Sequence, residues 1–192
     1  MIARMNTPDT KTRILAVARH MVQAHGYNAL SIREVANEVG IKGPAVHHHY
    51  PTKGDLGAAL ARQYSDDAVV FLDGLLEQHR SERATFDHYI KVFRAALEND
   101  NRMCLSGIMA AEHHDLPEEV KVEVQRFMDI NVEWLTRLLS LDAERKDKKA
   151  NKARATAIFA AIEGAQLIAR GRSDIRVFDE TLRAYRIHGL IP

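Results

Sequence analysis

The stretch of residues 31–50, SIREVANEVGIKGPAVHHHY, constrains the fold of this chain more than any other. Ser31 and Glu34, three positions apart, are typical of a capping box at the start of a helix. Apolar residues follow at helical spacing, and Gly40 can close that helix in a left-handed conformation. Pro44 can open a second helix, because its missing N–H group costs nothing in a first turn. The string therefore predicts a helix-turn-helix.

The second helix of such a motif lies in the major groove of DNA, where short or polar side chains reach the base edges. Helix starts also favour phosphate, through their free N–H groups and the helix dipole. We therefore expect contacts with double-stranded DNA from ten residues: Ser31, Arg33, Lys42, Gly43, Pro44, Ala45, His47, His48, Thr52 and Lys53. Because Pro44 and Ala45 offer only apolar contacts, DNA shape is expected to share in the specificity.

Three consecutive histidines, His47 to His49, stand in the second helix. Consecutive helical residues point about 100° apart, so three in a row cannot converge on one metal ion. We predict no metal site here. His47 and His48 are expected to face DNA, and His49 and Tyr50 to pack inward.

This region resembles the DNA-binding domain of the tetracycline-repressor (TetR) family of bacterial transcription regulators. The resemblance covers residues 9–60 and is carried by Gly26-Tyr27, LSIREVA at 30–36, Gly40-Ile41 and VHHHYPTK at 46–53. Gly43-Pro44 and His47 depart from the family pattern, in which Lys-Gly and Tyr are common at these positions.

The resemblance implies an all-α fold of about nine helices. An N-terminal three-helix DNA-binding domain is expected at 8–55, with the recognition motif at 31–50, and a C-terminal helical ligand-binding and dimerisation domain at 56–192. The resemblance also implies a homodimer on a palindromic operator, and a small-molecule effector that releases the protein from DNA, which makes the protein a repressor. No metal ion and no cofactor are expected.

Helical spacing of apolar residues continues along nearly the whole chain. Outside the helix-turn-helix we expect a helix at about 8–25 and further helices at 52–79, 85–99, 103–113, 115–141, 153–170 and from about 174 to 188. The charge run at 142–152 is expected to form a solvated turn or a frayed helix. Thr52 is the expected cap of the fourth helix, and Asp115 that of the seventh.

Charge and cysteine content fit this interpretation. The net charge of the chain is only +1, but residues 1–55 carry +3 and the remainder −2. A basic end on a slightly acidic body suits phosphate attraction at that end. One cysteine excludes an internal disulfide framework, and no apolar run of 18 residues occurs, so a cytoplasmic protein without a membrane span is expected.

Aromatic residues, methionine and histidine supply the candidates for an effector pocket: Phe71, Phe93, Met109, His113, Phe127 and Trp134. The alternative is that such a stripe at helical spacing is plain core.

Cys104 is expected at the start of a short helix, near Arg102. A helix N-terminus and a nearby cation both lower a thiol pKa and favour the reactive thiolate. The segment around Cys104 also resembles the electrophile-sensing branch of the family, typified by the repressor of N-ethylmaleimide reductase. The resemblance implies a redox or electrophile sensor; the alternative is a small buried apolar residue.

Small residues dominate the eighth helix and predict a close helix–helix seam. With the last helix it is the expected dimer interface, through Ala157, Ala161, Gly164, Ile168, Phe178 and Leu182. The alternative is that Ala157, Ala161 and Gly164 simply pack inside one subunit.

Two other classes of protein remain as rivals. An enzyme is not expected, since the only acid–imidazole pair near a possible cavity is Glu112 with His113. A helical hairpin that binds another protein would lack the steep salt dependence of phosphate binding.

Overall fold

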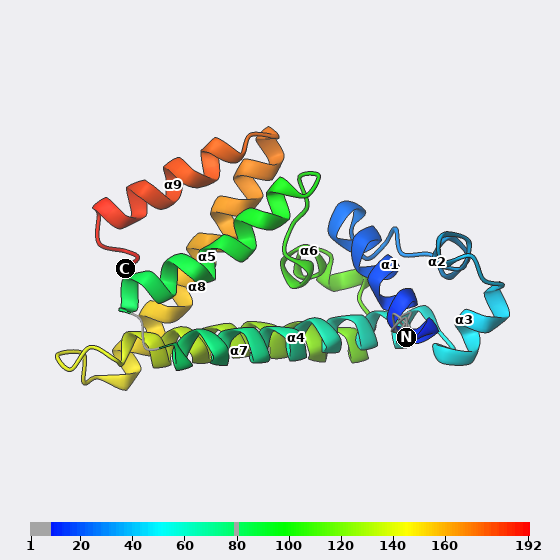
Figure 1. The fold of residues 1–192 in the computed structure, drawn as a ribbon, viewed down its shortest axis with the longest axis horizontal. Coiled ribbons are helices and arrows are strands. Elements are labelled where there is room, and N and C mark those ends of the chain that lie inside the picture. The colour runs from blue at the N-terminus through cyan, green and yellow to red at the C-terminus, as the bar shows by residue number, and fades with distance from the viewer. Residues whose placement is uncertain (1–8, 79–80) are drawn as a thin grey trace, which may run out of the picture.

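The computed structural model describes residues 9–78 and 81–192, and all regular structure within them is helical (Figure 1). The elements are α1 Thr10–His25, α2 Ile32–Val39, α3 Gly43–His49, α4 Lys53–Glu77, α5 Glu82–Glu98, α6 Leu105–Ala111, the 3-10 helix η1 His113–Asp115, α7 Glu118–Leu139, α8 Lys148–Arg172 and α9 Ile175–Ile187. The predicted all-α fold, with an N-terminal helix-turn-helix and a C-terminal helical part, is confirmed.

Local signals build the helix-turn-helix from α2 and α3 as predicted. Ser31 caps α2, its Oγ accepting a hydrogen bond from the N–H of Glu34 at 3.4 Å. Gly40 ends α2 with φ at 76°, in the left-handed region that glycine enters without steric cost. Pro44 lies in the first turn of α3. Both helices are too short to be stable alone, so packing must hold them.

That packing comes from a first core, which the three N-terminal helices share with parts of α4, α6 and α7. Its members include Ile14, Ala18, Val22, Val35, Val39, Val46, Tyr50, Leu56 and Leu60, joined by Leu105, Met109, Val120 and Val124. Each buried Leu or Ile stabilises the fold by about 1.5–3 kcal/mol. Since α6 and α7 contribute to this core, the helix-turn-helix is packed directly onto the rest of the protein.

Helices α4 and α7 form the most extensive helix–helix contact among the described residues and lie side by side along the lower edge of Figure 1. Trp134 of α7 donates a hydrogen bond from Nε1 to the carbonyl oxygen of Leu72 in α4, at 2.7 Å. Arg126 of α7 pairs with Asp66 of α4 at 2.6 Å, but an exposed pair of this kind contributes little. Apolar packing and the buried indole therefore hold the pair in register.

A second core lies among α4, α5, α7, α8 and α9, at the end of the molecule away from α2 and α3 (Figure 1). It includes Leu75, Phe86, Tyr89, Phe93, Leu135, Leu138, Ile158, Ile162, Phe178 and Leu182.

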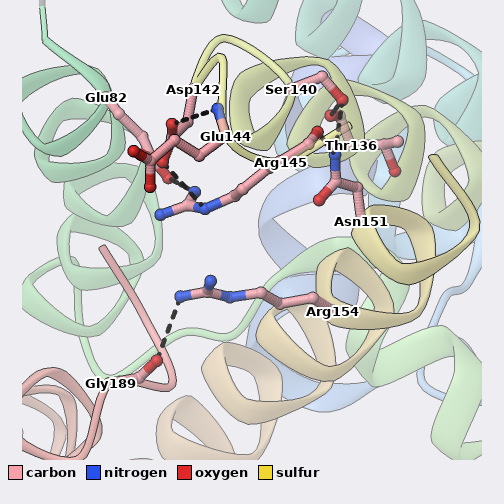
Figure 2. Close-up of polar contacts among 9 residues, drawn as sticks. All are labelled: Glu82, Thr136, Ser140, Asp142, Glu144, Arg145, Asn151, Arg154 and Gly189. Carbon is pink, nitrogen blue, oxygen red and sulfur yellow. Dashed lines mark hydrogen bonds and ion pairs between the residues drawn. The ribbon is translucent and has the colours of Figure 1, made fainter. Parts of the chain in front are cut away.

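Figure 2 shows how the connection between α7 and α8 is held. Arg145 pairs with Glu82 of α5 at 2.5 Å and with Asp142 at 3.3 Å. Asn151 donates to Ser140 Oγ and to the carbonyl oxygen of Arg145, both at 3.0 Å. The charged segment predicted as a turn or a frayed helix is therefore an ordered connection up to Asp147, and its last five residues belong to α8.

Helix ends differ from the prediction where a cap went unrecognised. Asp147 caps α8, which begins five residues early and runs through Gly171 to a left-handed Ser173 with φ at 50°. Ser81 caps α5, which begins three residues early. Asp115 does not cap α7, because it lies in η1 and Pro117 takes the N-cap position.

Thr52 caps α4 in a reciprocal capping box with Asp55, as predicted. The predicted ends at residues 8 and 79 lie outside the described residues. In the part of the chain that the structure describes, no helix has the length and apolar character needed to cross a membrane.

Candidate nucleic-acid interface and internal cavities

The exposed face of α3 is the candidate nucleic-acid interface. Pro44, His47 and His48 are exposed, whereas Val46 is fully buried and anchors the helix from below. His49 is exposed too, so the expectation that it packs inward is wrong. One turn of helix past Val46, the inward position falls on Tyr50, which is buried as predicted.

The other predicted contact residues lie around this face. Those with exposed side chains are Arg33, Lys42 and Thr52, and those half-buried are Ser31, Gly43, Ala45 and Lys53. Their contacts with DNA remain a prediction.

Two basic side chains near this face, Arg13 and His47, already donate hydrogen bonds to backbone carbonyl oxygens. Arg13 of α1 donates to the carbonyl oxygen of Val39 at the end of α2, at 2.5 Å. His47 donates from Nδ1 to the carbonyl oxygen of Pro51 at 3.0 Å. Arg13 thus stabilises the end of α2, a role that its sequence position in α1 did not signal.

Lys53 has a structural task as well. Its Nζ donates to the carbonyl oxygen of Asn28 at 3.0 Å and lies 4.7 Å from the ring centroid of Tyr27. Burial lowers the pKa of Lys53 below its ordinary value, while the nearby Glu112 carboxylate opposes that shift. Lys53 therefore ties α4 to the loop between α1 and α2.

Glu112, at the end of α6, holds the same loop. Its Oε2 accepts hydrogen bonds from the N–H groups of Tyr27, at 2.5 Å, and Asn28, at 3.2 Å. Asn28 also donates from its side chain to Asp115 at 2.8 Å. Since this carboxylate is engaged by backbone amides, the rival interpretation of Glu112 as an acid beside His113 loses its support.

A third tie comes from α8. Arg170 donates to the carbonyl oxygens of Gln23 and Ala24 at the C-terminal end of α1, at 2.9 and 2.7 Å. A cation at this end of a helix also interacts favourably with the helix dipole. The N-terminal region is thereby joined to α4, α6 and α8.

A cavity of about 200 Å³, here called the central cavity, lies among α1, α4, α5, α7 and α8. Its apolar wall consists mainly of Tyr64, Phe71, Leu72, Tyr89, Phe93 and Phe127. Three of the predicted pocket residues, Phe71, Phe93 and Phe127, therefore line it.

The other three predicted pocket residues lie elsewhere. Met109 is buried in the first core, His113 is exposed on η1, and Trp134 lies behind the cavity wall with its N–H bonded to Leu72. Helical spacing identified them as inward or polar, but spacing does not distinguish a cavity wall from the core behind it.

Polar groups of the central cavity were missed by sequence reasoning. Gln166 donates to the carbonyl oxygen of Phe93 at 2.8 Å and accepts from the N–H of Cys104 at 2.9 Å. Asn131 accepts from the Tyr89 hydroxyl at 2.9 Å. The available signal was an amide residue on an otherwise apolar helix face.

Arg19 brings a positive charge from α1 to this cavity. Its guanidinium lies 4.6 Å from the ring centroid of Tyr64 and 3.8 Å from Asp67 Oδ2. The cavity wall therefore includes a side chain from α1, the helix that shares the first core with the helix-turn-helix.

Cys104 also lines the central cavity, and it is buried. Burial raises its pKa well above the ordinary value, and the nearby Glu163 raises it further. Arg102 instead donates to His20 Nε2 at 2.8 Å. The expected lowering of the thiol pKa is therefore wrong, because burial outweighs the helix start.

The predicted dimer residues divide between two faces. Ala157 and Ile168 are exposed on α8, and Ala161 and Gly164 lie half-buried between them. Phe178 and Leu182, at 1% and 6% exposure, point into the second core of their own subunit instead. The dimer interface itself, and the alternative that Ala157, Ala161 and Gly164 pack inside one subunit, remain predictions.

The described residues contain no group of three or more His, Cys, Asp or Glu side chains arranged to hold a metal ion.

Comparison with known proteins identifies the N-terminal region. Residues 14–60 match the family described as bacterial regulatory proteins, tetR family. A curated relative, the HTH-type transcriptional activator FasR of Mycolicibacterium smegmatis, is 21% identical over 74% of this chain. The match spans 66% of that protein, just under two thirds of its length.

Solved structures resemble the whole chain. A TetR transcriptional regulator from Legionella pneumophila is 28% identical with a TM-score of 0.90, over 98% of this chain and all of that one. A TetR-family regulator from Agrobacterium tumefaciens is 27% identical with a TM-score of 0.83, over 91% and 94%. The reduced form of NemR from E. coli, at 18% identity over 96% and 98% and a TM-score of 0.81, shares the fold.

The Glu112 contact predicts a measurable stability change. Replacing Glu112 by Ala removes a charged acceptor from two amides and should lower the free energy of unfolding by about 1–2 kcal/mol. Urea denaturation followed by circular dichroism measures it. The matched control is Glu133→Ala on the exposed side of α7, which should change stability by less than about 0.5 kcal/mol. Equal effects of the two substitutions would contradict the assignment.

Proposed function

Because the chain belongs to the TetR family of bacterial regulatory proteins, we propose that it is a homodimeric repressor released from a palindromic operator by a small molecule. In this proposal residues 8–55 bind DNA, with the recognition motif at 31–50, and residues 56–192 bind the effector and dimerise. The observation that carries the effector proposal is the central cavity, because its wall combines apolar residues of the body with Arg19 of α1.

Repression rests on geometry at the DNA. The two recognition helices of a dimer must meet successive major grooves, about 34 Å apart. A ligand that enters the central cavity changes the packing of α4 and of Arg19, and with it the position of α3. A coupling of about 1–3 kcal/mol between ligand and operator is typical of such regulators.

Dimerisation is assigned to the outer face of α8. Ala157, Ala161 and Gly164 lie at helical spacing and leave room for the backbone of a partner helix. Leu167 and Ile168 add apolar surface, with 55% and 52% of each residue exposed to solvent in one protomer. An apolar face of this kind supports an interface rather than a solvated surface.

The alternative is a repressor that senses electrophiles through Cys104. Its support is that Cys104 lines the central cavity, where a small electrophile can enter. The raised pKa of the buried thiol argues against it, since the thiolate is the reactive form. N-ethylmaleimide release of operator DNA, compared between the wild type and Cys104→Ser, decides. Equal release from both proteins would exclude the thiol.

Selection of genomic fragments tests DNA binding. Purified protein is mixed with sheared source DNA, and the bound pieces are sequenced. Enrichment of fragments that share a palindrome is expected, with affinity falling steeply as salt rises. Lys42→Ala should reduce the salt slope by about 1 if Lys42 contacts a phosphate, whereas Lys91→Ala on the exposed face of α5 should not. No enrichment at low salt from a folded dimer would contradict the proposal.

A filled cavity should imitate the effector. Ala96 of α5 lines the central cavity, and its neighbour Ala95 is exposed outside it. Ala96→Phe is therefore expected to weaken operator binding by about 5- to 100-fold, and Ala95→Phe to leave it unchanged. Fluorescence anisotropy with the selected operator measures both, and thermal unfolding verifies that each variant is folded. Tighter operator binding by Ala96→Phe would reverse the sign and indicate an activator, as the FasR relative is named.

A further inference from the structure

A second cavity of about 220 Å³, here called the α6–α8 cavity, opens between those two helices. Its wall includes Met103, Ser106, Gly107, Met128, Phe159 and Glu163, and it continues to Gly164 and Leu167 on the α8 face proposed for dimerisation. It shares no lining residue with the central cavity, and Cys104 borders the central cavity alone.

Glu163 of α8 is the unusual member of this wall. Its two carboxyl oxygens are buried from water, and neither accepts a hydrogen bond of normal geometry within the described residues. Burial raises the pKa of Glu163 to about 7, and the neighbouring Cys104 thiol offsets only part of that shift. Among the described residues, no Lys or Arg pairs with this carboxyl group or contributes to its pKa.

Ser106 of α6 adds a second unused group to the same wall. Its Oγ is buried and has no hydrogen-bond partner among the described residues. Buried polar groups are almost always hydrogen-bonded, and an ionised carboxylate without a partner costs several kcal/mol. Two such groups on the wall of one cavity make it a candidate binding site.

Gly107 makes room for this carboxyl group. A Cβ atom at position 107 would lie 2.3 Å from Glu163 Oε2, so any larger residue would displace the side chain. The acid on α8 and the glycine on α6 are therefore matched in shape, although neither contributes to the first or the second core.

We propose that the α6–α8 cavity binds a small organic cation, a protonated alkylamine, with Glu163 as its counter-charge and Ser106 Oγ as a hydrogen-bond acceptor. The ammonium group supplies charged N–H donors to the carboxyl group, whose neighbour in the empty site is the neutral Cys104 thiol. Met103, Met128 and Phe159 suit the alkyl part, and a cation gains further from sulfur and aromatic neighbours. An anion would meet an acid, and a neutral ligand would leave the carboxyl group without its charge partner.

This site is connected to the DNA-binding region through α6. Gly107 contacts Glu163 in the middle of that helix, and Glu112 at its end binds the amides of Tyr27 and Asn28. An amine that draws the Glu163 carboxylate into the cavity changes the support of α6 and, through Glu112, that of the loop before α2. This effect on DNA rests on the proposed function, whereas amine binding does not.

Isothermal titration with three probes of equal chain length tests the charge class. We expect n-hexylammonium to bind the wild-type dimer at pH 8 at least tenfold more tightly than n-hexanol or hexanoate. Glu163→Gln should remove this preference, and Ser106→Ala should weaken it. Glu133→Gln, on the exposed side of α7, is the matched control and should leave it intact. Equal affinity for the amine and the alcohol, or an unchanged affinity in Glu163→Gln, would overturn the proposal.

The titration also has a pH signature. The amine favours the ionised form of Glu163, whose pKa in the empty site is about 7. The ionised fraction rises about tenfold between pH 6 and pH 8, so affinity should rise by about tenfold over that range. At pH 6 binding should release close to one proton, seen as a buffer-dependent heat. Tyr64, Tyr89 and Cys104, the titratable groups coupled to Glu163, stay neutral throughout because burial raises the pKa of each.

Operator binding is measured separately on the same variants. A folded Glu163→Gln protein that loses the amine but binds the operator supports the site. Amine binding without any operator binding would leave the site standing and remove the proposed function. A pH-independent amine affinity in the wild type would overturn the role of Glu163.

Discussion

Arg170 crosses from α8 to the C-terminal end of α1 and binds two carbonyl groups in the last turn, where helical hydrogen bonding runs out. Together with Glu112 on the following loop, it fixes the end of α1 against the body of the protein. The position of α2 and α3 depends on that end, because the loop that follows α1 leads directly into α2. The position of the helix-turn-helix therefore depends on contacts made by α6 and α8.

The two cavities have separate walls, and each reaches the region around the end of α1. The central cavity reaches α1 through Arg19, and the α6–α8 cavity reaches the loop after α1 through Gly107 and Glu112. Cys104 lies between them, bordering the first and contacting Glu163 of the second. Its buried thiol is thus part of the wall that keeps an apolar site and an acidic site apart.

Much of the fold was predictable because its signals are local. Ser31, Gly40, Pro44 and Thr52 each act within one helical turn, so capping and turn rules located α2, α3 and the start of α4. Caps without a nearby apolar pattern, Ser81 and Asp147, were missed. Helical spacing also predicted that His49 packs inward, whereas His49 is exposed and Tyr50 is buried. The inward face of a short helix is determined by the residues that it packs against.

The candidate sites depended on distant residues and were less predictable. Phe71, Phe93 and Phe127 were recognised as aromatic candidates, but Tyr64, Gln166 and Arg19 join them only through tertiary packing. Local reasoning even gave the wrong direction for the Cys104 pKa, since burial cannot be read from a helix start and a nearby cation. The sequence around Glu163 gave no sign of a binding residue. Its carboxyl group is buried because α6 packs over it at Gly107, and this contact is not visible in the sequence.

The ties between the DNA-binding region and the body are made mainly to backbone atoms. Arg170 binds carbonyl oxygens, Glu112 binds amide N–H groups, and Lys53 binds the carbonyl oxygen of Asn28. Backbone groups are the same whatever side chains the helices carry. The surface of α3 is therefore free to diverge, or to be exchanged for that of a relative, while the mechanical attachment to the body is inherited unchanged.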